Sequence, residues 1–165
     1  IPCRFHGFTI DNQLQKGAIP WYLFPFAPRY IIHSWVEIWF QGRWLELEGF
    51  IIDKTFLTAV QKKFCGIQGP FSGYGIATRC LAAPEVEWKG KNTYIQKEGI
   101  HDDFGVYDEP DTFYAEKGSN LSGIKKVLYR YLLRHVINTH VKKLRDKATK
   151  KDEMLHRLPS QKLKG

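Results

Sequence analysis

Two segments in the first third of the chain show the alternation of apolar and polar positions that predicts β-strands. Residues 3–10 mix aromatic and β-branched side chains, and residues 31–40 alternate along their whole length. In the second segment the even-numbered positions, among them Val36 and Ile38, are mostly apolar, which predicts that they face the core. Gln41 and Gly42 then suit a tight turn, so residues 31–48 are predicted to form an antiparallel hairpin.

The rest of the chain predicts three helices separated by loops. Residues 54–63 and 111–117 suit short helices, and residues 121–147 place apolar side chains at helical spacing. Residues 65–75, which hold four glycines, are predicted to form a loop, and residues 76–120 to be otherwise irregular. We therefore expect an α+β fold, in which an antiparallel sheet is accompanied by helices and by a long C-terminal helix. The expected units are a domain of residues 1–120, a basic amphipathic helix of residues 121–147 that packs on it or extends from it, and a flexible basic tail of residues 148–165.

Charge is distributed unevenly along the 165 residues. The formal net charge is +8, but residues 1–120 hold 12 basic and 14 acidic side chains, whereas residues 121–165 hold 13 basic and 3 acidic ones. Any attraction to nucleic acid or to an anionic membrane would therefore come from the C-terminal segment. The tail of residues 148–165 lacks interleaved aromatic residues, so no specific nucleic-acid partner is predicted. No apolar run approaches the roughly 20 residues that span a bilayer, so no membrane partner is predicted either.

A histidine, a tryptophan and a glutamate occupy every second position in the first strand of the predicted hairpin. They are His33, Trp35 and Glu37, and after the turn come Trp44 and an acid at Glu48. This His-x-Trp-x-Glu hairpin resembles the transglutaminase-like superfamily of papain-type cysteine enzymes. The Ile-Pro-x-Arg start of the chain is similar to the strand that precedes the hairpin in that family. The resemblance covers about residues 1–57, and it implies that residues 1–120 form part of a transglutaminase-like, cysteine-proteinase-like core.

The resemblance also implies catalytic roles. In the family a cysteine at a helix N-terminus attacks an acyl carbon, a histidine accepts the thiol proton, and an acid orients the imidazole. Carried onto this chain, the base is His33. The acid is Glu48, which is one methylene longer than the aspartate usual in the family, and Asp53 is the alternative. The implied reaction is acyl transfer through a thioester, either to water, as in a protease or amidase, or to an amine.

The chain has no cysteine at the sequence position where the family has its nucleophile. In the family it precedes the first strand by about a helix length, so we expect it upstream of residue 1 and expect this truncated chain alone to be inactive. Cys3 is an alternative, although it lies inside the strand. Cys65 and Cys80 follow His33 in the sequence, which reverses the order found in the family.

The resemblance implies a peptide or protein amide as substrate and no cofactor. His101, Asp102 and Asp103 form a local cluster without further ligands nearby, so no metal site is predicted. Two alternatives stay open: an inactive member that binds peptides in the same cleft, and a protein that binds nucleic acid or an anionic membrane through its basic tail. Three cysteines without a paired CxxC spacing favour a cytoplasmic setting. The oligomeric state and the role of residues 76–120 are not predicted.

Overall fold

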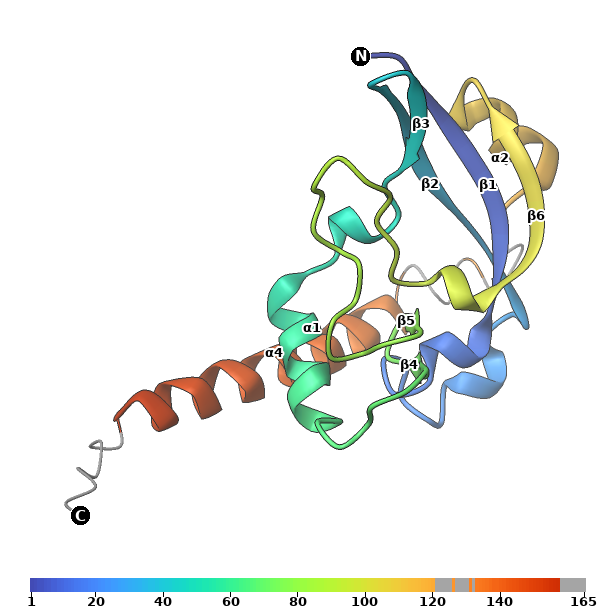
Figure 1. Cartoon of the computed structure of the whole chain (residues 1–165). Helices are drawn as coiled ribbons and strands as arrows, with labels where there is room; N and C mark the ends of the chain where they lie inside the picture. The colour runs from blue at the N-terminus through green and yellow to red at the C-terminus, as the bar shows by residue number, and fades with distance from the viewer. Residues whose placement is uncertain (121–125, 127–130, 132, 158–165) are drawn as a thin grey trace.

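The computed structural model describes residues 1–120, 126, 131 and 133–157. An antiparallel sheet in the order β3-β2-β1-β6 is formed by β1 (Cys3–Asp11), β2 (Tyr30–Phe40), β3 (Arg43–Glu46) and β6 (Ile100–Tyr107). A separate ribbon pairs β4 (Phe71–Gly73) with β5 (Ile76–Thr78). The α-helices are α1 (Lys54–Lys63), α2 (Pro110–Lys117) and α4 (Arg134–Arg157), and short 3₁₀ turns lie at Asn12–Gln15, Phe24–Phe26, Gly49–Ile51 and Lys97–Gly99. Figure 1 shows a curled sheet flanked by helices, which confirms the α+β class.

The predicted hairpin and the predicted helix after it are both present, and local chemistry explains each. Gln41 and Gly42 have φ values of 50° and 80°, the conformation of a two-residue turn that matches the twist of the flanking strands. The turn pairs Phe40 with Arg43 across the hairpin. Helix α1 begins after Asp53, whose side chain accepts a hydrogen bond from the backbone N–H of Phe56 at 3.1 Å and so caps the helix.

The buried face of the sheet is the opposite of the one that the apolar pattern predicts. On β2 the even-numbered Val36 is 45% exposed, whereas the odd-numbered Trp35 and Glu37 are 6% and 3% exposed. The prediction that the even positions face the core is therefore wrong at the centre of this strand. Trp35 packs against Phe8 of β1 with a ring-centroid distance of 4.5 Å, and an aromatic ring of this size buries more apolar area than a valine. Residues 76–78 and 93–96 cover this face, which only the tertiary fold could bring there.

The other face of the sheet is closed around one aromatic side chain of α2. Phe113 is fully buried and its ring lies 5.4 Å from that of Phe5 on β1. The ring also rests directly on the backbone of Gly7, because a Cβ built there would lie only 2.2 Å from the ring. The glycine therefore allows α2 to approach the sheet.

Substituting Gly7 with alanine is expected to lower the free energy of unfolding by roughly 1–3 kcal/mol, since the added methyl must displace the Phe113 ring from a filled site. Urea unfolding followed by far-UV circular dichroism measures the change. Gly66→Ala is the control, because a Cβ there meets nothing within 4 Å. Equal stability of the two variants would show that α2 does not pack on Gly7 in solution.

A second apolar cluster joins α1 to α4 and to the ribbon. Its buried members are Phe56, Leu57, Val60, Phe71, Ile76, Leu81, Val86 and Ile95. Val141 and Leu144 of α4 pack against this cluster, and Arg145 Nε lies 3.1 Å from Asp53 Oδ2. The described part of the C-terminal helix thus packs on the domain by its first half, while its second half projects from the body in Figure 1.

The structure corrects three other sequence predictions. Helix α4 continues to Arg157, past the end predicted at residue 147, because residues 148–157 contain no Gly or Pro and the next proline is Pro159. Residues 121–125, 127–130 and 132 of the predicted helix lie outside the described residues. Strand β6 falls in the segment predicted to be irregular, and β4 falls in the segment predicted to be a loop. Strand β6 is polar and pairs with the distant β1, whereas β4 has only three residues and pairs with the neighbouring β5.

Candidate functional site

His33 is a partly buried side chain on the same face of the sheet as Trp35. It lies opposite Phe8 in the pairing of β1 with β2, and the two rings meet edge to face with centroids 5.3 Å apart. Burial lowers the pKa of His33 below its ordinary value of 6.5. The imidazole is therefore neutral at pH 7, the state that a proton acceptor requires. It makes no hydrogen bond to another described residue.

Glu48 lies just after the second strand of the hairpin. Glu37 pairs with Glu46, and the backbone N–H of Leu47 donates to the carbonyl of Val36 at 3.0 Å, which extends the register by one residue. Strand β3 ends at Glu46, and Glu48 follows it with a helical backbone conformation at the start of the 3₁₀ turn Gly49–Ile51.

The carboxylate of Glu48 is only 4% exposed and is held by the chain that covers the sheet. Its Oε2 accepts hydrogen bonds from the backbone N–H groups of Ile95 at 2.5 Å and Gln96 at 2.8 Å. Burial raises the pKa of Glu48 despite these opposing hydrogen bonds. Oε1 accepts no hydrogen bond from a described residue. The structure describes no hydrogen bond between Glu48 and His33, so their catalytic pairing stays a prediction.

Asp53, the alternative acid, has a structural position. One of its carboxylate oxygens caps α1, and the other faces Arg145 of α4. The structure therefore gives Asp53 a role in joining two helices and no contact with His33.

The cysteines of the chain are dispersed. Cys3 pairs with Ile38 at the far end of β1, an odd position that points to the face opposite that of Phe8 and His33. Cys65 is exposed in the loop after α1. Cys80 borders a cavity of about 250 Å³, together with Tyr94 and Lys97. The structure places none of these thiols against His33.

Four charged side chains on three strands of the sheet form a connected group that the sequence did not predict as a group. Glu37 accepts a hydrogen bond from Arg4 Nε at 2.6 Å through Oε2. Its Oε1 accepts from His6 Nδ1 at 2.6 Å and from Trp35 Nε1 at 3.3 Å. His6 Nε2 lies 2.7 Å from Asp103 Oδ1 on β6. We call Arg4, His6, Glu37 and Asp103 the charge chain.

The charge chain is held in its ionised state by its own hydrogen bonds. Burial alone would lower the pKa of His6, but hydrogen bonds to Glu37 and Asp103 outweigh it and raise that pKa. Burial alone would raise the pKa of Glu37, but hydrogen bonds from His6, Arg4 and Trp35 outweigh it and lower that pKa. Both imidazole nitrogens lie within hydrogen-bond distance of a carboxylate, an arrangement that favours the imidazolium, in which both nitrogens donate. The charge chain therefore ties β1, β2 and β6 together and does not act as a base.

The charge chain could have been predicted from the sequence only if the pairing register of β1 and β2 had been known. Arg4 and His6 alternate with apolar residues on the first strand, a sign that they share a face. Their opposite partners on β2 are Glu37 and Trp35, and these follow from the pairing of two strands separated by 18 residues.

Comparison with known proteins found no relative of this chain. No family model, no curated protein and no solved structure matches it. Within the described residues, no three or more His, Cys, Asp or Glu side chains gather as a metal site would need. No described helix combines the length and the apolar character needed to cross a membrane.

Proposed function

We propose that this chain supplies the base and the carboxylate of a transglutaminase-like thiol acyl-transfer site, with His33 as the base and Glu48 as the acid. The observation that carries the proposal is that one hairpin has a neutral histidine on its first strand and a buried glutamate just after its second strand. The combination suits general-base chemistry, since a neutral imidazole accepts a proton and a nearby carboxylate stabilises the resulting cation.

The proposed reaction uses each group in turn. His33 takes the proton of an attacking thiol, and the thiolate adds to the carbonyl carbon of an amide. The proton passes from His33 to the leaving nitrogen when the carbon–nitrogen bond breaks, which leaves a thioester. Water or an amine then releases the acyl group and the thiol regains its proton. Glu48 acts through His33, by favouring the protonated imidazole in each transition state.

The attacking thiol in this proposal does not come from Cys3. In the β1–β2 register Cys3 lies on the far face of the sheet and five residues along β1 from the partner of His33. The proposal therefore requires a cysteine in another position, as the family resemblance implies, and a peptide or protein amide as the substrate.

A second candidate is a peptide-binding protein without catalytic activity. It is favoured by the two backbone hydrogen bonds that already hold Oε2 of Glu48. A carboxylate held in this way stabilises the covering chain, whether or not it serves His33.

The two candidates differ in the coupling between His33 and Glu48, which NMR titration of the histidine ring can measure on this chain. Burial keeps the pKa of His33 below 6.5. Under the first candidate, Glu48→Gln should lower that pKa further, because the variant removes the carboxylate that is proposed to favour the imidazolium. Glu87→Gln, an exposed substitution, is the control and should leave the pKa of His33 unchanged. An unchanged pKa in Glu48→Gln would show that the two groups are not coupled and would favour the second candidate.

A further inference from the structure

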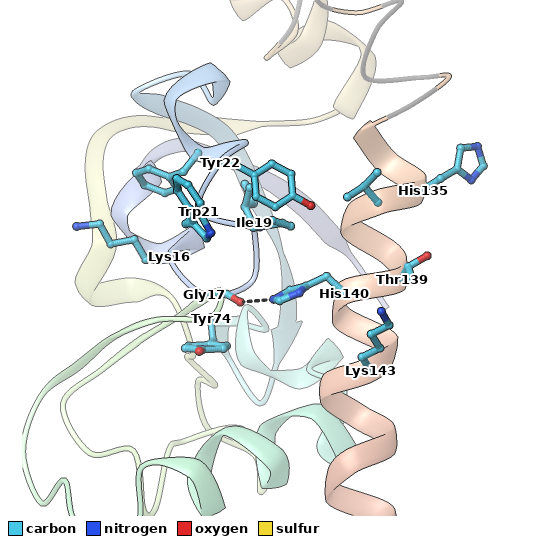
Figure 2. Close-up of a pocket in the computed structure, with 13 residues that line it drawn as sticks. Lys16, Gly17, Ile19, Trp21, Tyr22, Tyr74, His135, Thr139, His140 and Lys143 are labelled. Atoms are coloured by element: carbon cyan, nitrogen blue, oxygen red, sulfur yellow. Dashed lines mark hydrogen bonds between the residues drawn. The ribbon is translucent and has the colours of Figure 1, made fainter.

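A pocket of about 800 Å³ lies between the loop at residues 16–24 and the first turns of α4. Figure 2 shows Trp21 and Tyr22 on the loop side and His140 and Lys143 on the helix side, with Tyr74 at the base. A volume of this size is typical of small-molecule sites. The pocket lies apart from the His33 face, since neither His33 nor Glu48 lines it.

The loop side of the pocket presents aromatic rings to solvent. Trp21 is 85% exposed, and its ring meets that of Tyr22 edge to face at 5.8 Å. Phe24 and Tyr74 add two further rings to the lining. Large exposed aromatic groups that are gathered in a concave site are suited to stack on a planar ligand.

The helix side of the pocket is basic. None of the 13 lining residues is acidic, whereas lysines line it at Lys16 and Lys143. Helix α4 as a whole carries eight basic and three acidic residues. The Lys143 side chain makes no ion pair with another described residue, so its charge is available to a ligand. The pocket therefore favours an anion.

His140 fixes the two sides relative to each other. Its Nε2 donates a hydrogen bond to the carbonyl of Gly17 at 3.0 Å, which Figure 2 shows as a bridge from α4 to the loop. The contact orients the imidazole with its other nitrogen, Nδ1, without a partner among the described residues. Lys143 lies one turn further along the same side of the helix.

We propose that this pocket binds a nucleotide, with the base stacked on Trp21 and Tyr22 and the phosphate held by Lys143 beside His140. The nucleotide is either free or one unit of a single strand, because both offer the same base and phosphate. Aromatic rings on one wall and unpaired positive charge on the other match these two parts of the ligand. The site is independent of the proposed acyl transfer.

Isothermal titration calorimetry with AMP, adenosine, inorganic phosphate and a ten-nucleotide thymidine strand tests this proposal. We expect AMP to bind at least tenfold more tightly than adenosine or phosphate alone, since each of these lacks one half of the ligand. Trp21→Ala and Lys143→Glu should each weaken AMP binding by tenfold or more. Trp88→Ala and Lys142→Glu are the matched controls, because neither residue lines the pocket, and should bind AMP as the parent does.

The strand distinguishes the two sources of the nucleotide. Tighter binding of the strand than of AMP, weakened by Trp21→Ala and Lys143→Glu but not by Lys142→Glu, would identify a single strand as the ligand. Equal weakening by Lys142→Glu and Lys143→Glu would indicate general attraction to α4 and would overturn the proposal. Failure of AMP and the strand to bind at millimolar concentration would overturn it as well. Circular dichroism of each variant checks that it is folded.

Discussion

Replacing Glu37 with glutamine is expected to lower the free energy of unfolding by about 3 kcal/mol, at the lower end of the cost of breaking a buried ion pair. The substitution keeps the size of the side chain and removes its charge. His6 and Arg4 then lose the carboxylate that holds them, although Arg4 keeps some contact with solvent. Chemical unfolding monitored by tryptophan fluorescence measures the change directly, because Trp35 lies within the same group of contacts.

The matched control is Glu98→Gln. Glu98 pairs with Arg79 at 2.9 Å, and both side chains are largely exposed to solvent. An exposed pair of this kind contributes less than about 1 kcal/mol. If both variants lose the same small amount, the charge chain does not stabilise the sheet.

The charge chain also predicts how stability depends on pH. The pKa of Glu37 is lowered by folding, so its contribution is present above the unfolded value of 4.5 and is lost as the pH falls through the folded pKa. The pKa of His6 is raised by folding, so its contribution is full below the unfolded value of 6.5 and is lost as the pH rises through the folded pKa. The stabilisation by the chain is therefore greatest between about pH 4.5 and 6.5.

Unfolding measured across the pH range checks this profile. The difference in stability between the parent and His6→Ala should be largest in that window and should shrink on both sides of it. A difference that stays constant from pH 4 to pH 9 would show that His6 contributes by packing alone, and not by charge.

Substitution of His33 with alanine, in a protein that also supplies the attacking cysteine, is expected to reduce turnover of an amide substrate by about 10²–10⁴-fold, the usual contribution of a general base. The loss should appear mainly in kcat, because His33 is proposed to move a proton and not to hold the substrate. Release of ammonia from a glutamine peptide, or of the amine from a small amide, measures the rate. This prediction rests on the proposed acyl-transfer function.

His101→Ala is the control for this experiment. His101 is an exposed histidine on β6 that stacks on Tyr30 at the start of β2 and pairs with Asp102, and neither contact involves His33. It should leave kcat unchanged. Activity retained in His33→Ala, in a protein that melts at the parental temperature, would exclude His33 as the base.

The secondary structure near the proposed site could be predicted because its causes are local. The alternation of residues 31–40, the turn at Gln41 and Gly42, and the cap at Asp53 each act within a few residues, and each feature is present in the structure. Strand β6 could not be predicted in the same way. Its polar residues resemble a loop until Asp103 and its neighbours meet β1, about 95 residues earlier in the chain.

The candidate site was predictable to the extent that it follows from the hairpin register. Counting across the turn predicts that Glu48 lies on the face of Trp35 and His33, and the structure follows the counted register as far as the pair of Glu37 and Glu46. The partners of these residues could not be counted in this way. Glu48 is held by the backbone of Ile95 and Gln96, which only the folded chain brings to it.

The sequence by itself determined the strands β1, β2 and β3, the turn, α1 and the basic character of the C-terminal helix, because periodicity, turn chemistry and charge are properties of neighbouring residues. The tertiary structure alone decided which face of β2 is buried, since burial depends on what covers a strand and not on its own alternation. It also decided that the basic helix, which has no interleaved aromatic residues, lies beside Trp21 and Tyr22. A pocket assembled from segments more than 100 residues apart leaves no pattern in either segment alone.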